Sequence, residues 1–167
     1  MINKEKNTGQ KNLKNFIREF EKFSNSLKES IGPISEKDLI DFQYSAPFSV
    51  PEEYLLLLSY SNGFSLMGDE IYGIGCNCLG LSMEDAYHIE HDLVENPMPS
   101  HIIPFSPDGA GNHYCFDSNN GHIIVWQHDL PCNINLANYV YDNLFDMIEE
   151  VFFEWTLEDW NYDGTRK

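Results

Sequence analysis

The stretch from Ile102 to His128 constrains the fold most, because it holds three short apolar segments separated by two turns. The first segment stops at 106–109, where a proline fixes φ and a glycine accepts a positive φ. The second segment, 112–117, alternates apolar and polar side chains, and the turn at 118–121 leads into a third alternating segment. We therefore expect an α/β (α+β) fold with a twisted, largely antiparallel central sheet flanked by helices.

The length of the chain predicts a single domain. Its 167 residues can bury an ordinary core without disulfides. We expect residues 1–30 to form a basic N-terminal helix packed on the body, and residues 31–167 to form the body. No apolar run suits a signal peptide or a membrane helix, so we expect a cytoplasmic protein. In that reducing compartment we expect free thiols at all four cysteines, Cys76, Cys78, Cys115 and Cys132.

Charge is distributed unevenly along the chain, whose formal net charge is −17. Residues 1–37 hold eight of the ten Lys and Arg residues, and the other two are Arg166 and Lys167. Residues 38–165 therefore contain no Lys or Arg, although they hold 22 of the 27 acidic residues. Such a body cannot neutralise phosphates, which argues against nucleic-acid binding. A cationic protein partner would relieve the repulsion among its carboxylates.

The N-terminal region is expected to be helical from Lys11 onward. Apolar residues there form a stripe at helical spacing, and the cations lie mainly away from it. The stripe consists of Leu13, Phe16, Ile17, Phe20, Phe23 and Leu27. A basic amphipathic helix can lie on a membrane. We instead expect this helix to pack on the domain, with its cations beside the acidic body and residues 1–10 frayed.

Four further helices are indicated. Ser35 and Ser82 each begin a capping box, and the second of these helices is expected to end near Asn96. Pro51 suits the first position of a helix that is apolar nearly all round and should be the most buried. A last helix is expected over 138–152.

Short motifs occur along the chain in a fixed order. They are Leu39 to Phe42, Val50 to Leu58, Asn62 and Gly63, Tyr72 to Ile74, Ile103 to Phe105, Asp108 to Asp117, Ile123 to His128 and the Phe-rich last helix. This order resembles the SUKH superfamily, which includes fungal cell-wall assembly regulators and bacterial immunity proteins of toxin systems. The resemblance covers residues 34–155 and implies helices around an antiparallel sheet, a binding role and no catalytic residues.

Two metal or catalytic interpretations compete with a binding role. Cys76 and Cys78 with His88 and His91 could form a zinc site, although the cysteines lack the usual two-residue gap. Cys115 with nearby histidines could be a nucleophile, but it lies within a strand rather than at an exposed turn. The glycines at 109 and 111 lack the residues of a phosphate-binding loop. We expect no enzyme activity, no metal and no cofactor.

The predicted function is that of an immunity protein bound to a cognate basic toxin domain, and nucleases fit because they carry cationic surfaces for phosphate. The alternative is a regulatory or scaffold module that binds a cellular protein. No nucleic-acid, membrane or small-molecule partner is expected.

The predicted partner-binding residues lie on turns or exposed strand positions. A hairpin formed by 64–67 and 70–74 provides one such turn. We expect the N-terminal and Pro51 helices to cover one face of the central sheet and to leave the other face or its rim available. Acidic residues also favour turns for local hydrogen-bonding reasons, which is the alternative for each of them. The set is Asp69, Glu70, Asp108, Asp117, Asp129 and Trp126.

Overall fold

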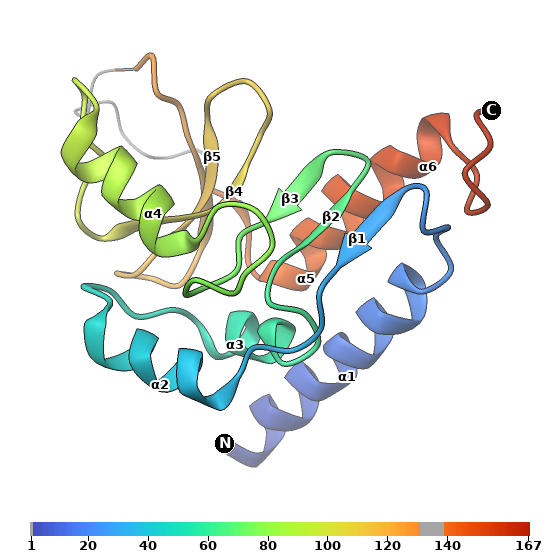
Figure 1. The fold of residues 1–167 in the computed structure, drawn as a ribbon, viewed down its shortest axis with the longest axis horizontal. Helices are drawn as coiled ribbons and strands as arrows, with labels where there is room; N and C mark the ends of the chain where they lie inside the picture. The colour runs from blue at the N-terminus through green and yellow to red at the C-terminus, as the bar shows by residue number, and fades with distance from the viewer. Residues whose placement is uncertain (1, 131–138) are drawn as a thin grey trace.

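The computed structural model describes residues 2–130 and 139–167, and it is a mixed α+β domain (Figure 1). Four strands form one antiparallel sheet in the order β4-β5-β6-β7. They are β4 (Ile102–Pro107), β5 (His113–Asp117), β6 (Ile123–Trp126) and β7 (Tyr139–Tyr141). The three predicted strands and their antiparallel order are confirmed, whereas β7 was not predicted.

Pairing in this sheet places alternate side chains on opposite faces, as predicted. Cys115 of β5 lies opposite Ile124 of β6, and Phe116 lies opposite Ile123. Phe116 belongs to the main core, and Cys115 belongs to a smaller apolar cluster. Both faces of the sheet are therefore buried.

A second antiparallel sheet has the order β1-β2-β3, with β1 at Lys28–Ser30, β2 at Phe64–Leu66 and β3 at Asp69–Ile71. The predicted hairpin is confirmed as β2 and β3, but β3 ends at Ile71 rather than residue 74. Met67 and Gly68 form its two-residue turn, both with positive φ, at 53° and 100°. This conformation matches the right-handed twist of the flanking strands.

Helix α1 (Ile2–Phe20) begins and ends earlier than the sequence predicted. Its buried face includes Leu13, Phe16 and Phe20. The chain leaves the helix after Phe20 because the C-terminal tail packs there, where the Ser24 N–H donates to the Tyr162 carbonyl at 2.7 Å. Phe23 remains buried beyond the helix end. Across the described residues, no helix has the length and apolar character needed to cross a membrane.

Helices α2 (Glu36–Ser45) and α3 (Glu52–Leu58) form where they were predicted. Ser35 caps α2 by accepting the Asp38 N–H at 3.0 Å. Tyr54, Leu57 and Leu58 of α3 are fully buried, which confirms α3 as a core helix. Leu55 and Leu56 are partly exposed.

Ser82 caps helix α4 (Met83–His88), which continues as the π-helical turn η1 (Ile89–Leu93). The predicted capping box is thus present, but the helix ends before Asn96. The Ser82 hydroxyl accepts the Asp85 N–H at 3.1 Å and is itself buried.

We predict that Ser82→Ala lowers the free energy of unfolding by about 1 kcal/mol, because the Asp85 N–H loses its acceptor. Urea denaturation should show a lower midpoint with an unchanged slope. Ser118→Ala, on an exposed turn, is the control and should leave the midpoint unchanged. Equal midpoints for both variants would contradict the capping role.

The C-terminal helix consists of α5 (Leu144–Met147), η2 (Ile148–Glu154, π-helical) and α6 (Trp155–Asp159). It begins after Asn143, whose side chain accepts the Asp146 N–H. The predicted start at 138 lies outside the described residues, and the following residues form β7 instead. Phe152 and Phe153 of this helix are buried.

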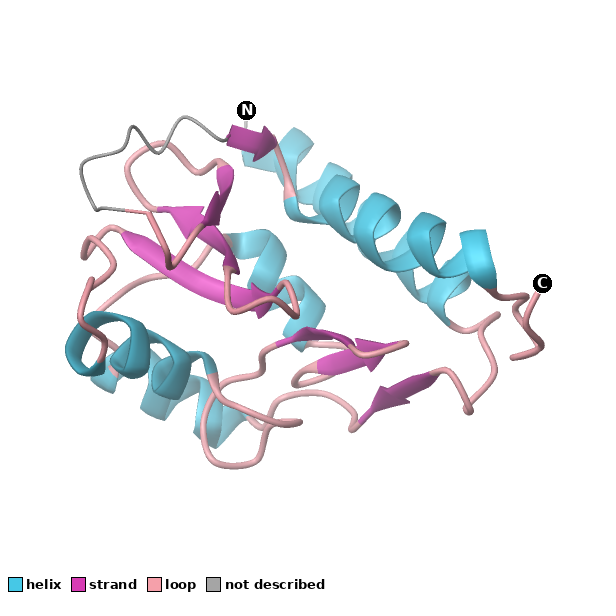
Figure 2. Cartoon of the chain, turned by 90° about the horizontal axis from the view of Figure 1, so that it is seen from above, coloured by secondary structure: helices cyan, strands magenta, loops and turns pink. Residues whose placement is uncertain are grey.

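The two faces of the four-stranded sheet are covered by different parts of the chain (Figure 2). Tyr54 of α3 packs on Phe105 and Phe116 on one face. On the other face Met98 joins Cys115 and Ile124 in the smaller cluster. The prediction of an open second face is therefore wrong, because the segment after α4 covers it.

Candidate functional site

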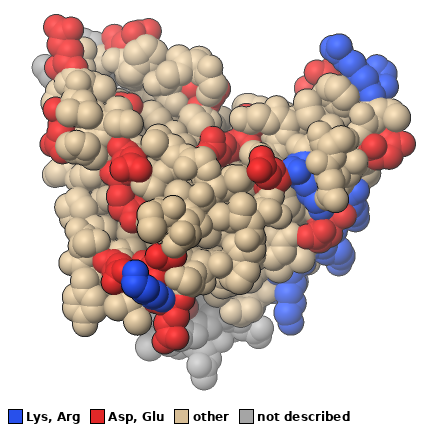
Figure 3. All heavy atoms as spheres, viewed as in Figure 1, with Lys and Arg blue, Asp and Glu red and all other residues tan. Residues whose placement is uncertain are grey.

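An acidic notch lies where β3, the β4–β5 turn and the C-terminal helix approach one another. We define it by four carboxylates and two tyrosines: Asp69, Asp108, Glu150, Glu154, Tyr114 and Tyr141. Figure 3 shows a hollow in the molecular outline between the four-stranded sheet and the end of the C-terminal helix, with acidic atoms on its floor. The hollow offers a concave surface to a partner.

The tyrosines show that these carboxylates act on one small region. Burial raises the pKa of Tyr114, and the nearby charges of Asp108, Asp69 and Glu150 raise it further. Burial also raises the pKa of Tyr141, as do its hydrogen bond to Glu150 and the charges of Glu150 and Glu154. Both phenols stay neutral and can donate hydrogen bonds at neutral pH.

Cations gather on another flank of the molecule. Figure 3 shows them mainly along α1 and the C-terminal tail, away from the sheet and α4. Lys22 pairs with Glu19 at 2.7 Å, and Lys28 pairs with Glu21 at 3.0 Å, so both lysines form ion pairs with acids of the same flank. Lys37 pairs with Asp41 at 3.1 Å. The other ion pairs among the described residues join carboxylates to histidines, as in His88 with Asp92.

Two of the predicted residues, Asp69 and Asp108, meet at the notch. Burial raises the pKa of Asp69, which begins β3. Burial alone would raise the pKa of Asp108, but hydrogen bonds from Asn112 and the Ala110 N–H hold it below its usual value. Its carboxylate accepts the N–H groups of Ala110 at 2.8 Å and Asn112 at 2.9 Å. Asp108 thus shapes the turn as well as adding charge.

Glu70 follows Asp69 on the strand but contacts a different region. Its carboxylate lies against Gly80 and accepts the Leu81 N–H. One of its oxygens is buried without a hydrogen-bond partner. Burial raises the pKa of Glu70. The carboxylate of Glu70 therefore contacts the loop that precedes α4 and is not part of the acidic notch.

Asp117 and Asp129 lie apart from the notch. Asp117 accepts the Asn119 N–H at 2.9 Å and the Asn120 side-chain amide at 2.8 Å, and so shapes the β5–β6 turn. Asp129 is exposed and pairs with His128 at 2.9 Å. It borders a separate cavity of about 320 Å³, whose lining includes Glu90, Glu95 and Gly111.

Trp126 is a core residue, with only 3% of its surface exposed. It packs with Met98, Ile102 and Cys115. Because it faces inward, it offers no aromatic surface to a partner in this structure. Trp155 on the C-terminal helix is 48% exposed and does present an aromatic surface to solvent.

The residues of the thiol interpretation form a buried structural network. Cys115 is fully buried, and burial raises its pKa well above the usual value, which disfavours the thiolate that a nucleophile requires. His113 hydrogen-bonds to Glu90 at 3.2 Å and to the Tyr72 hydroxyl at 3.4 Å. This network ties η1 to both sheets.

The residues of the zinc interpretation are also engaged elsewhere. His91 contacts the backbone carbonyls of Tyr87 and Pro99, and His88 pairs with Asp92. Residues 2–130 and 139–167 contain no group of three or more His, Cys, Asp or Glu side chains arranged to hold a metal ion. Cys76, Cys78 and Cys115 are free thiols, and Cys132 lies outside the described residues.

Sequence reasoning missed Glu150 and Glu154. Their spacing of four, continued by Glu158, is a signal in the sequence, but the predicted last helix ended at residue 152 and so did not include Glu154 or Glu158. The contact between that helix and β7 was not visible, because β7 itself was not predicted. Only the fold shows that these acids face Tyr114 and Tyr141.

We predict that the protein is more stable at pH 5.5 than at pH 8. Burial raises the pKa of Glu53, Asp69, Glu70 and Glu84, so the folded state holds more protons than the unfolded state as pH falls toward the ordinary pKa of a carboxyl group. Stability from these groups is present below the unfolded pKa and is lost as pH rises through the folded pKa. Relief of the −17 charge acts in the same direction.

Thermal unfolding scans across pH test this expectation. Tm should rise by a few degrees between pH 8 and pH 5.5, and fall again below about pH 4 as Asp38 and Asp108, whose pKa values are lowered, become protonated. Glu84→Gln should flatten the rise. A Tm that is lower at pH 5.5 than at pH 8 would contradict the account.

The fold defines a mixed α+β domain with a group of carboxylates around Tyr114 and Tyr141. Residues 33–150 match the model of the SMI1 / KNR4 family (SUKH-1), and the chain belongs to this family. No curated protein matches the chain significantly. The match confirms the resemblance to the SUKH superfamily, and α1 lies outside the matched region.

Proposed function

We propose that the chain is an immunity protein that binds and neutralises a cognate basic toxin domain in the cytoplasm. The observation that carries the proposal is the absence of any Lys or Arg from residues 38–165 of a SUKH-1 family member. A surface of one sign raises the association rate of an oppositely charged partner by about 10- to 1,000-fold. A nuclease fits this role because its cationic surface binds phosphate.

The acidic notch supports a docking site for such a partner. Its carboxylates place negative charge around Tyr114 and Tyr141, whose neutral hydroxyls add hydrogen-bond donors. Trp155 is exposed on the C-terminal helix and can supply an apolar anchor. Neither a cofactor nor a small-molecule substrate enters this function, and the chain acts by covering the toxin.

Isothermal titration against an inactivated form of the toxin domain encoded next to this chain tests the proposal. We expect stoichiometric binding at 50 mM salt that weakens at 500 mM. In a separate activity assay, the chain should abolish the activity of the unmodified toxin domain. No binding at low salt would overturn the proposal.

A regulatory or scaffold role, as in the fungal relatives that the sequence resembles, is the second function within the family's range. It predicts an isolated gene without a neighbouring toxin, and a cellular partner that retains its activity when bound. Toxin neutralisation distinguishes the two functions.

A further inference from the structure

The segment 75–81, which runs from β3 toward α4, is held at both ends by carboxylates. At its start the Gly75 N–H donates to Glu84 at 3.0 Å, and at its end the Leu81 N–H donates to Glu70. The second oxygen of Glu84 and one oxygen of Glu70 are buried without a hydrogen-bond partner among the described residues. Such buried acceptors are uncommon in folded proteins and call for a physical reason.

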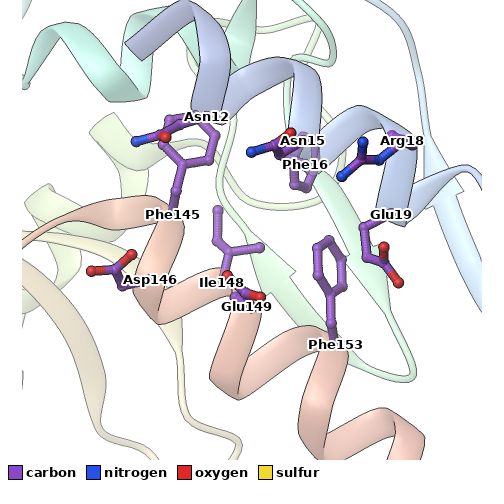
Figure 4. A pocket seen from close by; sticks show the side chains of 10 residues that line it. All are labelled: Asn12, Asn15, Phe16, Arg18, Glu19, Phe145, Asp146, Ile148, Glu149 and Phe153. Carbon is purple, nitrogen blue, oxygen red and sulfur yellow. The ribbon is translucent and has the colours of Figure 1, made fainter. Parts of the chain in front are cut away.

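Other acids of the chain lie in water. Asp146 and Glu149, for example, are exposed at the edge of the groove between α1 and the C-terminal helix (Figure 4). Glu70 instead lies so close to Gly80 that a side chain at Gly80 would overlap its carboxylate. The closed segment therefore keeps water away from part of each of the two buried carboxylates.

No cation compensates Glu70 and Glu84. Lys37 lies near this region but pairs with Asp41 at 3.1 Å, and residues 38–165 hold no Lys or Arg. The titratable groups that act on the two carboxylates are Asp38 of α2, Tyr54 of α3, Tyr72 after β3, Cys78 of the segment and Asp85 of α4. None of these groups is positively charged, so a proton is the simplest group that can neutralise either carboxylate.

Closure of the segment is linked to proton uptake. Burial raises the pKa of Glu70 and of Glu84 and outweighs the N–H groups of Gly75 and Leu81, which lower it. In an open segment, water reaches both carboxylates and their pKa values return toward the usual range. The stability that these groups give to the closed segment is complete below the open-state pKa, and it is lost as pH rises through the closed-state pKa.

We propose that the segment 75–81 is a proton-dependent clasp, which closes over Glu70 and Glu84 when they are neutral and opens more often when they are ionised. Opening also breaks the hydrogen bonds of Asn77 to Asp38 at 3.0 Å and to Asn62 at 3.3 Å, so the open state is a minor one whose population depends on pH. The inference does not depend on the proposed function.

Hydrogen exchange of single backbone amides tests the clasp in the intact chain. Protection factors, corrected for the intrinsic effect of pH on exchange, are measured by NMR at pH 5.0 and pH 7.5. We expect the protection of the Gly75 and Leu81 amides to fall about threefold or more over this range. The Ile74 amide, which donates to the Asn62 side chain at 2.9 Å, should lose less protection.

Variants separate the two carboxylates from the total charge. The double variant Glu70→Gln, Glu84→Gln keeps oxygens that accept both N–H groups but cannot titrate, so the pH dependence at Gly75 and Leu81 should disappear. If the double variant does not fold, each single variant should reduce that dependence. Glu53→Gln is the matched control, because Glu53 also accepts a backbone N–H and burial raises its pKa, but it lies on α3. It should leave the dependence unchanged.

Three results would overturn the inference. The first is equal protection of the two amides at both pH values in the unmodified chain. The second is a pH dependence that the Glu70 and Glu84 variants retain in full. The third is protection at pH 7.5 that calcium chloride restores and EDTA removes, because a bound cation would then neutralise these carboxylates in place of a proton.

Discussion

Replacing Asn62 by Ala is expected to lower the free energy of unfolding by about 3 kcal/mol. Asn62 is 1% exposed, and its side chain holds the loop that leaves β3. It accepts the Ile74 N–H at 2.9 Å and donates to the Ile74 carbonyl at 2.9 Å. Without the amide, both backbone groups of a fully buried residue lose their partner, and each costs about 1–3 kcal/mol.

The backbone around Asn62 is already tightly packed. A side chain at Gly73 would lie 2.4 Å from the Asn62 carbonyl oxygen, so the two backbone segments are already in close contact. Urea denaturation gives the loss directly. Asn119→Ala, on an exposed turn, is the control and should cost little. A loss below about 1 kcal/mol for Asn62→Ala would show that water replaces the amide.

The second large effect concerns association with the toxin. The triple variant Asp69→Asn, Glu150→Gln and Glu154→Gln removes three charges from the acidic notch. We expect its association rate at low salt to fall about tenfold, because charges at the rim of an interface act mainly on encounter. The dissociation rate should change less. Stopped-flow fluorescence measures both rates.

A matched control removes three charges elsewhere. Glu29, Glu36 and Glu52 are exposed and lie outside the notch, so their Gln triple variant makes the same change in net charge. If both triple variants slow association equally, the total charge steers the partner and the notch has no special role. Circular dichroism should show an unchanged fold for both variants.

These three notch residues differ from the set that the sequence suggested for neutralisation, which was Asp69, Glu70 and Asp108. In the structure Glu70 accepts the Leu81 N–H, and Asp108 accepts two N–H groups of its own turn. Their substitution would disturb loops as well as charge. Among the described residues the Asp69 side chain has no hydrogen-bond partner, so it remains a suitable choice.

Local patterns in the sequence were enough to predict the elements that depend on neighbouring residues. The strands β4, β5 and β6 follow from alternation and turn chemistry, and Ser35 and Ser82 identify helix starts by their caps. The hairpin of β2 and β3 follows from its glycine turn. These features are determined within about ten residues of chain.

Long-range contacts explain what the sequence did not show. Helix α1 ends at Phe20 because the tail at Tyr162 packs against the next residues, 142 positions away in the chain. Trp126 was expected at the surface, yet Met98 covers it. Glu150 belongs to the notch because it hydrogen-bonds to Tyr141 of β7, a strand that the sequence did not predict. No local periodicity reports such contacts.

The central claim is that a body without cations steers a basic toxin to this protein. The most direct test is the association rate of the chain with its neighbouring toxin domain, measured from 20 mM to 500 mM salt. The account predicts a rate that falls at least tenfold across this range, because salt screens charges beyond a Debye length of about 10 Å at 0.1 M. An association rate that does not depend on salt would contradict it.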